Sequence, residues 1–122
     1  MNVLLGLGGT DESMRALDRT IERSRAVGDA LTIAILDKPE ADRSQTEMAA
    51  EAEEALEAAG FEADVVTLEG DPGSALVDFA ASEDYDELVI AGGTESPLGK
   101  IRLGPIAEFV LLNATMTVTL VR

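Results

Sequence analysis

The chain has 122 residues, 46% hydrophobic and 27% charged, which suits one domain spanning residues 1–122 with its own core. Twenty-four acidic against nine basic residues leave a net charge of -15, and this charge disfavours nucleic acid and anionic membranes as partners. The absence of cysteine and histidine excludes disulfides, thiolate zinc sites and imidazole general bases.

The first predicted elements are a strand and a helix. Residues 2–7 form a short apolar run closed by a Gly-Gly pair, which predicts a buried strand that ends in a tight turn. Apolar residues at helical spacing follow, with Asp11 or Ser13 as the expected N-cap and Gly28 at the expected end. We therefore expect the chain to begin with a strand and a helix.

The same alternation continues through the middle of the chain. Residues 30–36 are rich in β-favouring side chains and predict a second strand. Residues 44–59 are rich in alanine and glutamate and predict a helix that Gly60 ends. A third strand is expected over residues 62–68, around its two adjacent valines.

The next elements are a helix, a strand and a long loop. Asp71 is the expected N-cap of the third helix, with Pro72 at its first position. Residues 86–91 end in the apolar run Leu88 to Ala91 and predict the fourth strand. Residues 92–103 show no apolar period, and their glycines and proline predict a loop without regular structure.

The last predicted elements are a helix and a strand. The helix is expected to start near Gly104-Pro105 and to end at Asn113 in a left-handed conformation. Residues 115–121 then predict a strand at the edge of the sheet. Threonines alternate in it with three apolar residues, Met116, Val118 and Leu120.

Strands that alternate with helices imply right-handed crossovers and a parallel sheet covered on both faces. The predicted fold is therefore α/β, a three-layer doubly wound sandwich with a five-stranded parallel sheet and four helices. In such sheets ligands bind beyond the carboxyl ends of the strands, where the strand order reverses. This places a candidate site at the loops after the first and fourth strands.

Both of these loops are rich in glycine, but neither carries a complete phosphate-binding motif. Asp11 stands where the dinucleotide fingerprint needs its third glycine, and Ile101 follows Lys100 where a Walker A motif needs Ser or Thr. The candidate anion or nucleotide loop comprises Gly8, Gly9, Gly92, Gly93, Ser96, Gly99, Lys100, Arg102 and Gly104. Two alternatives remain open: the glycines only permit turns, and the two cations only neutralise nearby carboxylates.

Four motifs resemble those of the universal stress protein family. They are the Gly-Thr-acidic turn after the first strand, Gly70-Asp71-Pro72, the run from Asp86 to Gly92, and Leu103-Gly104 before the last helix. The resemblance covers the whole chain. It implies a sheet in the order 3-2-1-4-5, frequent dimerisation through the last strand and, in one subclass, ATP binding.

The ATP-binding motif of that subclass is only partly present. Pro105 replaces its Ser or Thr, which removes a hydroxyl and a backbone N–H, and Gly8 replaces the aspartate that contacts the nucleoside. We therefore expect a homodimeric stress-response or regulatory module that pairs through Met116, Val118 and Leu120, with weak or absent nucleotide binding and no efficient catalysis. The alternative is an ATP/ADP-binding switch that uses residues 92–104 and Mg²⁺ and hydrolyses ATP slowly.

The composition also bears on location and solvent. The apolar run at residues 3–7 is too short for a signal peptide core, so we expect a cytoplasmic protein. The chain has only two lysines and 24 acidic residues, and this composition resembles that of cytoplasmic proteins from salt-loving organisms. The alternative is an ordinary acidic protein.

Overall fold

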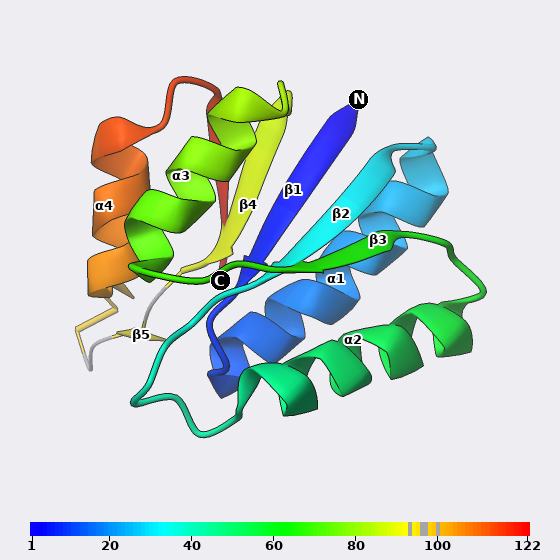
Figure 1. Ribbon diagram of the computed structural model, residues 1–122, viewed down its shortest axis with the longest axis horizontal. Helices are drawn as coiled ribbons and strands as arrows, with labels where there is room; N and C mark the ends of the chain where they lie inside the picture. Colours follow the sequence, from blue (N-terminus) through cyan, green and yellow to red (C-terminus); the bar gives the residue numbers. More distant parts are fainter. Residues whose placement is uncertain (93, 96–97, 100) are drawn as a thin grey trace.

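A sheet of five parallel strands lies at the centre of the fold, in the order β3-β2-β1-β4-β7 (Figure 1). The computed structural model describes residues 1–92, 94–95, 98–99 and 101–122. The strands of this sheet are β1 (Asn2–Leu7), β2 (Ala30–Ile35), β3 (Asp64–Thr67), β4 (Glu87–Ala91) and β7 (Thr117–Val121). The predicted doubly wound sheet in the order 3-2-1-4-5 is confirmed.

Four helices cover the sheet, two on each face (Figure 1). They are α1 (Asp11–Val27), α2 (Gln45–Ala59), α3 (Pro72–Ser82) and α4 (Pro105–Asn113). Leu17 of α1 and Ala52 of α2 belong to one core cluster, and Leu76 of α3 and Val110 of α4 belong to the other. No helix in the described part of the chain is long and apolar enough to cross a bilayer.

The central strand β1 contributes side chains to both core clusters. Val3 and Leu5 belong to the cluster under α1 and α2, whereas Leu4 belongs to the cluster under α3 and α4, because successive side chains of a strand point to opposite faces. Leu4 and Leu5 are both 0% exposed, so both faces of this strand are dry. A continuous apolar run is therefore what this strand position requires.

Two expected helix boundaries are wrong. The N-cap of α1 is Thr10, not Asp11 or Ser13, because the Thr10 hydroxyl accepts a hydrogen bond from the Ser13 N–H at 3.1 Å. Asn113 does not adopt a left-handed conformation: the extended Ala114 ends α4, and the Asn113 side-chain amide donates to the Phe109 carbonyl. Side-chain hydrogen bonds decided both positions.

The expectation that residues 92–103 lack regular structure is also wrong. Two short strands, β5 (Thr94–Glu95) and β6 (Ile101–Arg102), pair in antiparallel fashion there. Such a pair needs only two residues on each side with backbone groups free to meet, and glycines outside those positions do not prevent it. Two other predicted strands are shorter than expected, since β3 spans Asp64–Thr67 and β7 begins at Thr117.

Strand β7 lies at the edge of the sheet, as its sequence pattern predicts. Val118 and Leu120 of β7, and Met116 just before it, pack against the core cluster under α3 and α4 and are half-buried. They therefore contribute to the core of the molecule itself as well as to its edge.

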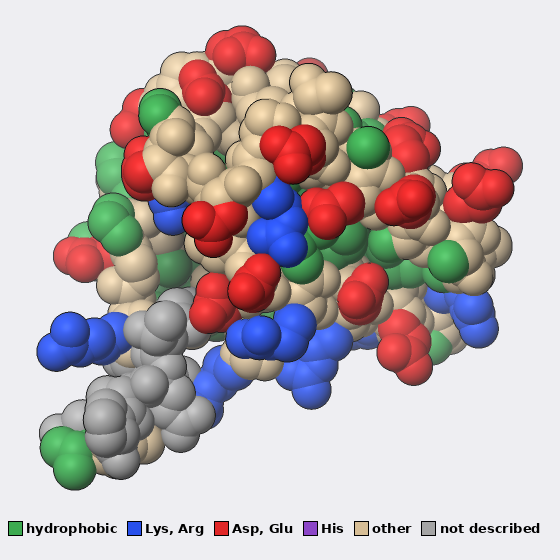
Figure 2. Space-filling model, turned by 90° about the horizontal axis from the view of Figure 1, so that it is seen from below, with side chains coloured by type: hydrophobic (Ala, Val, Ile, Leu, Met, Phe, Trp, Pro, Cys, Tyr) green, Lys and Arg blue, Asp and Glu red, His purple; other side chains and the backbone are tan. Residues whose placement is uncertain are grey.

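The acidic excess predicts how salt affects stability. Figure 2, which looks onto the lower end of Figure 1, shows acidic side chains spread over much of this face, with basic ones gathered mainly along one side. Because the Debye length falls to about 3 Å at 1 M salt, repulsion among these carboxylates is screened there. We expect the melting temperature to rise between about 0.1 and 2 M KCl. Calorimetry at several KCl concentrations measures this, and a flat response would reject adaptation to high salt.

Candidate functional site

A cavity of about 800 Å³ opens at the carboxyl end of the sheet. Gly8 after β1, Lys38 after β2 and Ala91 at the end of β4 contribute to it, as do the first residues of α3 and α4. Helices leave β1 and β4 toward opposite faces at this point, which separates the loops that follow the two strands. The cavity therefore occupies the expected ligand position of a doubly wound sheet.

Glycines allow close packing around this cavity. A Cβ placed on Gly8 would lie 3.9 Å from Ile106 Cδ1 and 4.0 Å from Lys38 Cδ, so these two side chains border the wall that Gly8 forms. At the start of α3, a Cβ on Gly73 would lie only 2.9 Å from the Phe109 ring. The absence of a side chain at Gly73 thus lets α3 and α4 approach each other beside the cavity.

The charged side chains that line the described part of the cavity have both signs. Two cations, Lys38 and Arg102, face three carboxylates, those of Glu12, Glu40 and Asp71. Like charges raise the cost of bringing several phosphates into one site. This lining suits a ligand with few negative charges better than a triphosphate.

The N-terminus of α4 supplies amide groups to the cavity. Gly104 is its N-cap, Pro105 its first residue, and the Glu108 N–H donates to the Gly104 carbonyl at 3.0 Å. The N–H groups of Ile106 and Ala107 are therefore left without a partner inside the helix, whereas Pro105 has no N–H to offer. Such amides can bind one anionic group.

Three residues of the candidate loop come together in this cavity. Gly8, Arg102 and Gly104 all contribute to its wall. Gly99 is exposed, with φ of +78°, and is not among the lining residues. Gly93, Ser96 and Lys100 lie outside the described residues.

Gly92 and Gly9 have structural roles near the cavity. The Gly92 N–H donates to the Val121 carbonyl at 2.6 Å, and a Cβ there would lie 3.0 Å from Leu120 Cγ, so this glycine allows the end of β4 to pack on β7. Gly9 has φ of +84°, and a Cβ on it would lie 2.9 Å from the Cβ of Ala41. Both glycines are explained by backbone geometry.

Arg43 ties the loop after β2 to the turn after β1. Its guanidinium donates to the Gly9 carbonyl at 3.1 Å and forms ion pairs with Asp11 at 3.1 Å and Glu51 at 2.9 Å. The hydrogen bond with Asp11 and the charge of Glu51 raise the pKa of Arg43 above its usual value. These contacts hold the loop that carries Lys38 against the cavity.

Lys38 is the functional candidate that sequence reasoning missed. It follows the buried strand β2, and its side chain borders the Gly8 wall. Its signal in the sequence is a lysine just past a predicted strand, in a chain with only two lysines. Only the strand order, which places β2 next to β1, brings this lysine to the cavity.

A doubly wound parallel sheet with a cavity beyond its central strands places this chain among the doubly wound α/β proteins. The family model described as the universal stress protein family matches residues 1–122, so this chain belongs to that family. Among curated proteins, none matches the chain significantly.

Several solved structures of this family resemble the chain over its whole length. A universal stress protein in complex with cAMP is 28% identical, with a TM-score of 0.79, and the match covers 100% of this chain and 96% of that one. A universal stress protein from Archaeoglobus fulgidus is 24% identical, with a TM-score of 0.80 and coverage of 100% and 98%. The Archaeoglobus fulgidus protein in complex with dAMP is 22% identical, with a TM-score of 0.75 and coverage of 100% and 98%. The last two similarities establish the fold alone.

The Arg43 contacts predict a measurable loss of stability. Arg43→Gln removes two ion pairs and weakens the bond to Gly9, so we expect the free energy of unfolding to fall by about 1 kcal/mol. Urea denaturation measures this change. Arg15→Gln, which removes the same charge from an exposed position, is the control and should cost less than about 0.5 kcal/mol. Equal losses for the two variants would contradict a specific role for Arg43.

Proposed function

We propose that this protein is a stress-response or regulatory module that acts by binding and not by efficient catalysis, with the 800 Å³ cavity as its ligand site. The relatives bound to cAMP and dAMP support a nucleotide with one phosphate as the ligand class. The chain has neither histidine nor cysteine, which leaves few groups for general-base or nucleophilic chemistry.

The observation that carries this proposal is Pro105 at the first position of α4. A triphosphate needs several donors, whereas this helix start offers two amides next to a lining in which carboxylates outnumber cations among the described residues. A single phosphate could be held by these amides with Lys38 or Arg102 nearby. ATP should therefore bind weakly or not at all.

A calorimetric comparison of cAMP, AMP and Mg-ATP tests this proposal. We expect the monophosphates to bind at least about tenfold more tightly than Mg-ATP, because each missing charged hydrogen bond costs roughly 1.5 to 3 kcal/mol. Lys38→Ala should weaken the monophosphates, and Arg15→Gln is the matched control for loss of one positive charge. Micromolar affinity for Mg-ATP that Lys100→Ala abolishes would favour the alternative, an ATP/ADP switch.

A gain-of-function variant extends that experiment by placing an aspartate at position 8, where the ATP-binding motif has one. Gly8 lies outside the left-handed region, and a Cβ on it makes only ordinary contacts, so Gly8→Asp fits without strain. If the cavity binds a nucleoside as in the ATP-binding subclass, Gly8→Asp should tighten adenosine by about tenfold. Gly8→Ala controls for the added Cβ, and an unchanged adenosine affinity in Gly8→Asp would contradict a nucleoside placed next to residue 8.

We also propose that two copies associate through β7. The two edges of the sheet differ in charge: the segment around β3 carries three acidic residues, Glu62, Asp64 and Glu69, whereas residues 114–121 carry none. In a chain of net charge -15, two copies meet with least repulsion at the uncharged edge. An edge strand also offers unpaired backbone groups to a second strand.

Matched substitutions on the two edges test this dimer. Thr117 and Thr67 are exposed residues of β7 and β3, so either can be changed without disturbing the core. Thr117→Asp places like charges across a symmetric interface and should shift the protein to monomer, whereas Thr67→Asp should leave the dimer intact. Size-exclusion chromatography with light scattering measures the mass. A monomeric wild type, or a dimer resistant to Thr117→Asp, would contradict the proposal.

A further inference from the structure

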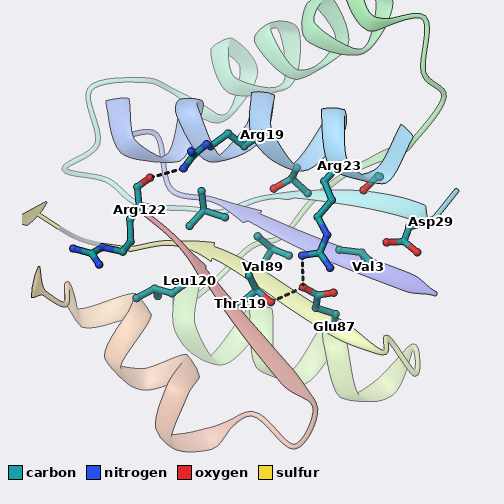
Figure 3. Close-up of a pocket in the computed structure, with 12 residues that line it drawn as sticks. Val3, Arg19, Arg23, Asp29, Glu87, Val89, Thr119, Leu120 and Arg122 are labelled. Carbon is teal, nitrogen blue, oxygen red and sulfur yellow. Dashed lines mark hydrogen bonds and ion pairs between the residues drawn. The ribbon is translucent and has the colours of Figure 1, made fainter. Parts of the chain in front are cut away.

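A second cavity, of about 380 Å³, lies between α1 and β7 (Figure 3). Helix α1 packs over β1 and β4, so the edge strand β7 extends beyond the helix that covers its neighbours. Side chains from α1, β4 and β7 point into the gap between them (Figure 3). This groove is separate from the cavity at the carboxyl end and shares no lining residue with it.

A buried carboxylate forms part of this groove. Glu87 is 4% exposed and stands in β4 next to Leu88, Val89 and Ile90, which are all buried. A buried charge is costly unless it is well paired, and a valine or leucine would suit this strand better. A buried acidic residue at this position therefore calls for a structural or functional reason.

The partners of Glu87 leave it incompletely coordinated among the described residues. The Thr119 hydroxyl donates to Glu87 Oε2, and Arg23 Nη1 lies 3.9 Å from the same oxygen (Figure 3). A charge-assisted hydrogen bond is about 2.7–2.9 Å long, so Arg23 does not bond this carboxylate closely. A carboxylate accepts up to about four hydrogen bonds. Glu87 therefore has capacity for a further donor.

Basic side chains border the same groove. Arg19, Arg23 and Arg122 are three of the nine cations in the chain. The Arg19 guanidinium donates to the main-chain oxygen of Arg122 at 2.9 Å, whereas the Arg23 side chain is 62% exposed and extends over Glu87 (Figure 3). A planar guanidinium with open donors next to a buried carboxylate can bind an anion and a cation side by side.

The remaining wall is partly apolar and partly polar. Val89 and Val121 line it beside the charged pair, and the volume is at the lower end of the range of about 300–1,000 Å³ seen for small-ligand pockets. Thr20, Ser24 and a second carboxylate, Asp29, also line it, and Asp29 already pairs with the Met1 ammonium at 3.4 Å. An anion alone would leave the buried Glu87 without a close positive partner, and a cation alone would leave the arginines unused. A small neutral zwitterion with an aliphatic group satisfies all three surfaces.

We propose that this groove binds an α-amino acid with a small aliphatic side chain. Its ammonium donates to Glu87, its carboxylate accepts from the Arg23 guanidinium, and its side chain contacts Val89 and Val121. The site is independent of the nucleotide cavity, so the amino acid acts as a second ligand of the module.

Binding of three isosteric compounds tests the proposal on the intact protein. L-leucine carries both charges, L-leucinamide lacks the carboxylate, and 4-methylpentanoate lacks the ammonium. Calorimetry at the salt concentration of greatest stability should show a Kd of about 1 mM or tighter for L-leucine and binding at least about tenfold weaker for the other two. No leucine binding at about 10 mM overturns the proposal, as does equal binding of either analogue.

Two variants and a control assign the contacts. Glu87→Gln keeps the side-chain shape and its acceptor for Thr119, and Arg23→Gln changes an exposed residue that the core does not need. Each should weaken L-leucine at least about tenfold, whereas Arg15→Gln, with the same charge change on α1, should leave its affinity unchanged. If Glu87→Gln fails to fold, Arg23→Gln alone decides. An unchanged affinity in Arg23→Gln, or an equal loss in Arg15→Gln, overturns the assignment.

Discussion

The pairing of β1 with β2 on one side and with β4 on the other is the constraint on which the rest of the structure depends. It sends α1 and α2 to one face and α3 and α4 to the other, because each crossover between parallel strands is right-handed. The loops that follow β1 and β4 then diverge at the carboxyl end. The larger cavity exists because of this divergence, and the two helix layers supply its walls.

The positions of the basic side chains distinguish the two cavities from the sheet edge at β7. Because the chain has only nine cations against 24 acidic residues, a place where basic side chains gather is a candidate for a structural or binding role. Arg43 uses its charge to join two loops, Lys38 and Arg102 face the larger cavity, and Arg23 borders the smaller one. The uncharged edge at β7 differs from these in offering backbone groups instead of charge, which suits a second copy of the same acidic chain.

Two single residues depart from the ATP-binding motif that the resemblance to the family implies. Gly8 leaves a wall without a carboxylate, and Pro105 removes one amide from the first turn of α4. Neither change alters the fold, because Gly8 needs no unusual backbone angle and proline is well accommodated at the first position of a helix. The residues that line the cavity can therefore differ while the scaffold stays the same.

The sequence alone was sufficient for the alternation of elements, the sheet class, the edge position of the last strand and the glycine-rich loops at the carboxyl end. These follow from local signals: apolar runs such as residues 2–7, caps such as Asp71, and proline at position 72. The short β5–β6 pair, the Thr10 cap and the conformation of Asn113 were not predictable. Each depends on which of several hydrogen-bond partners of similar energy a group selects.

Only the tertiary structure brought Lys38 to the wall beside Gly8. Only the tertiary structure placed Glu87 and Thr119 next to the open side of α1. These contacts join residues more than 25 positions apart, and their proximity depends on strand order and register, which no local pattern encodes.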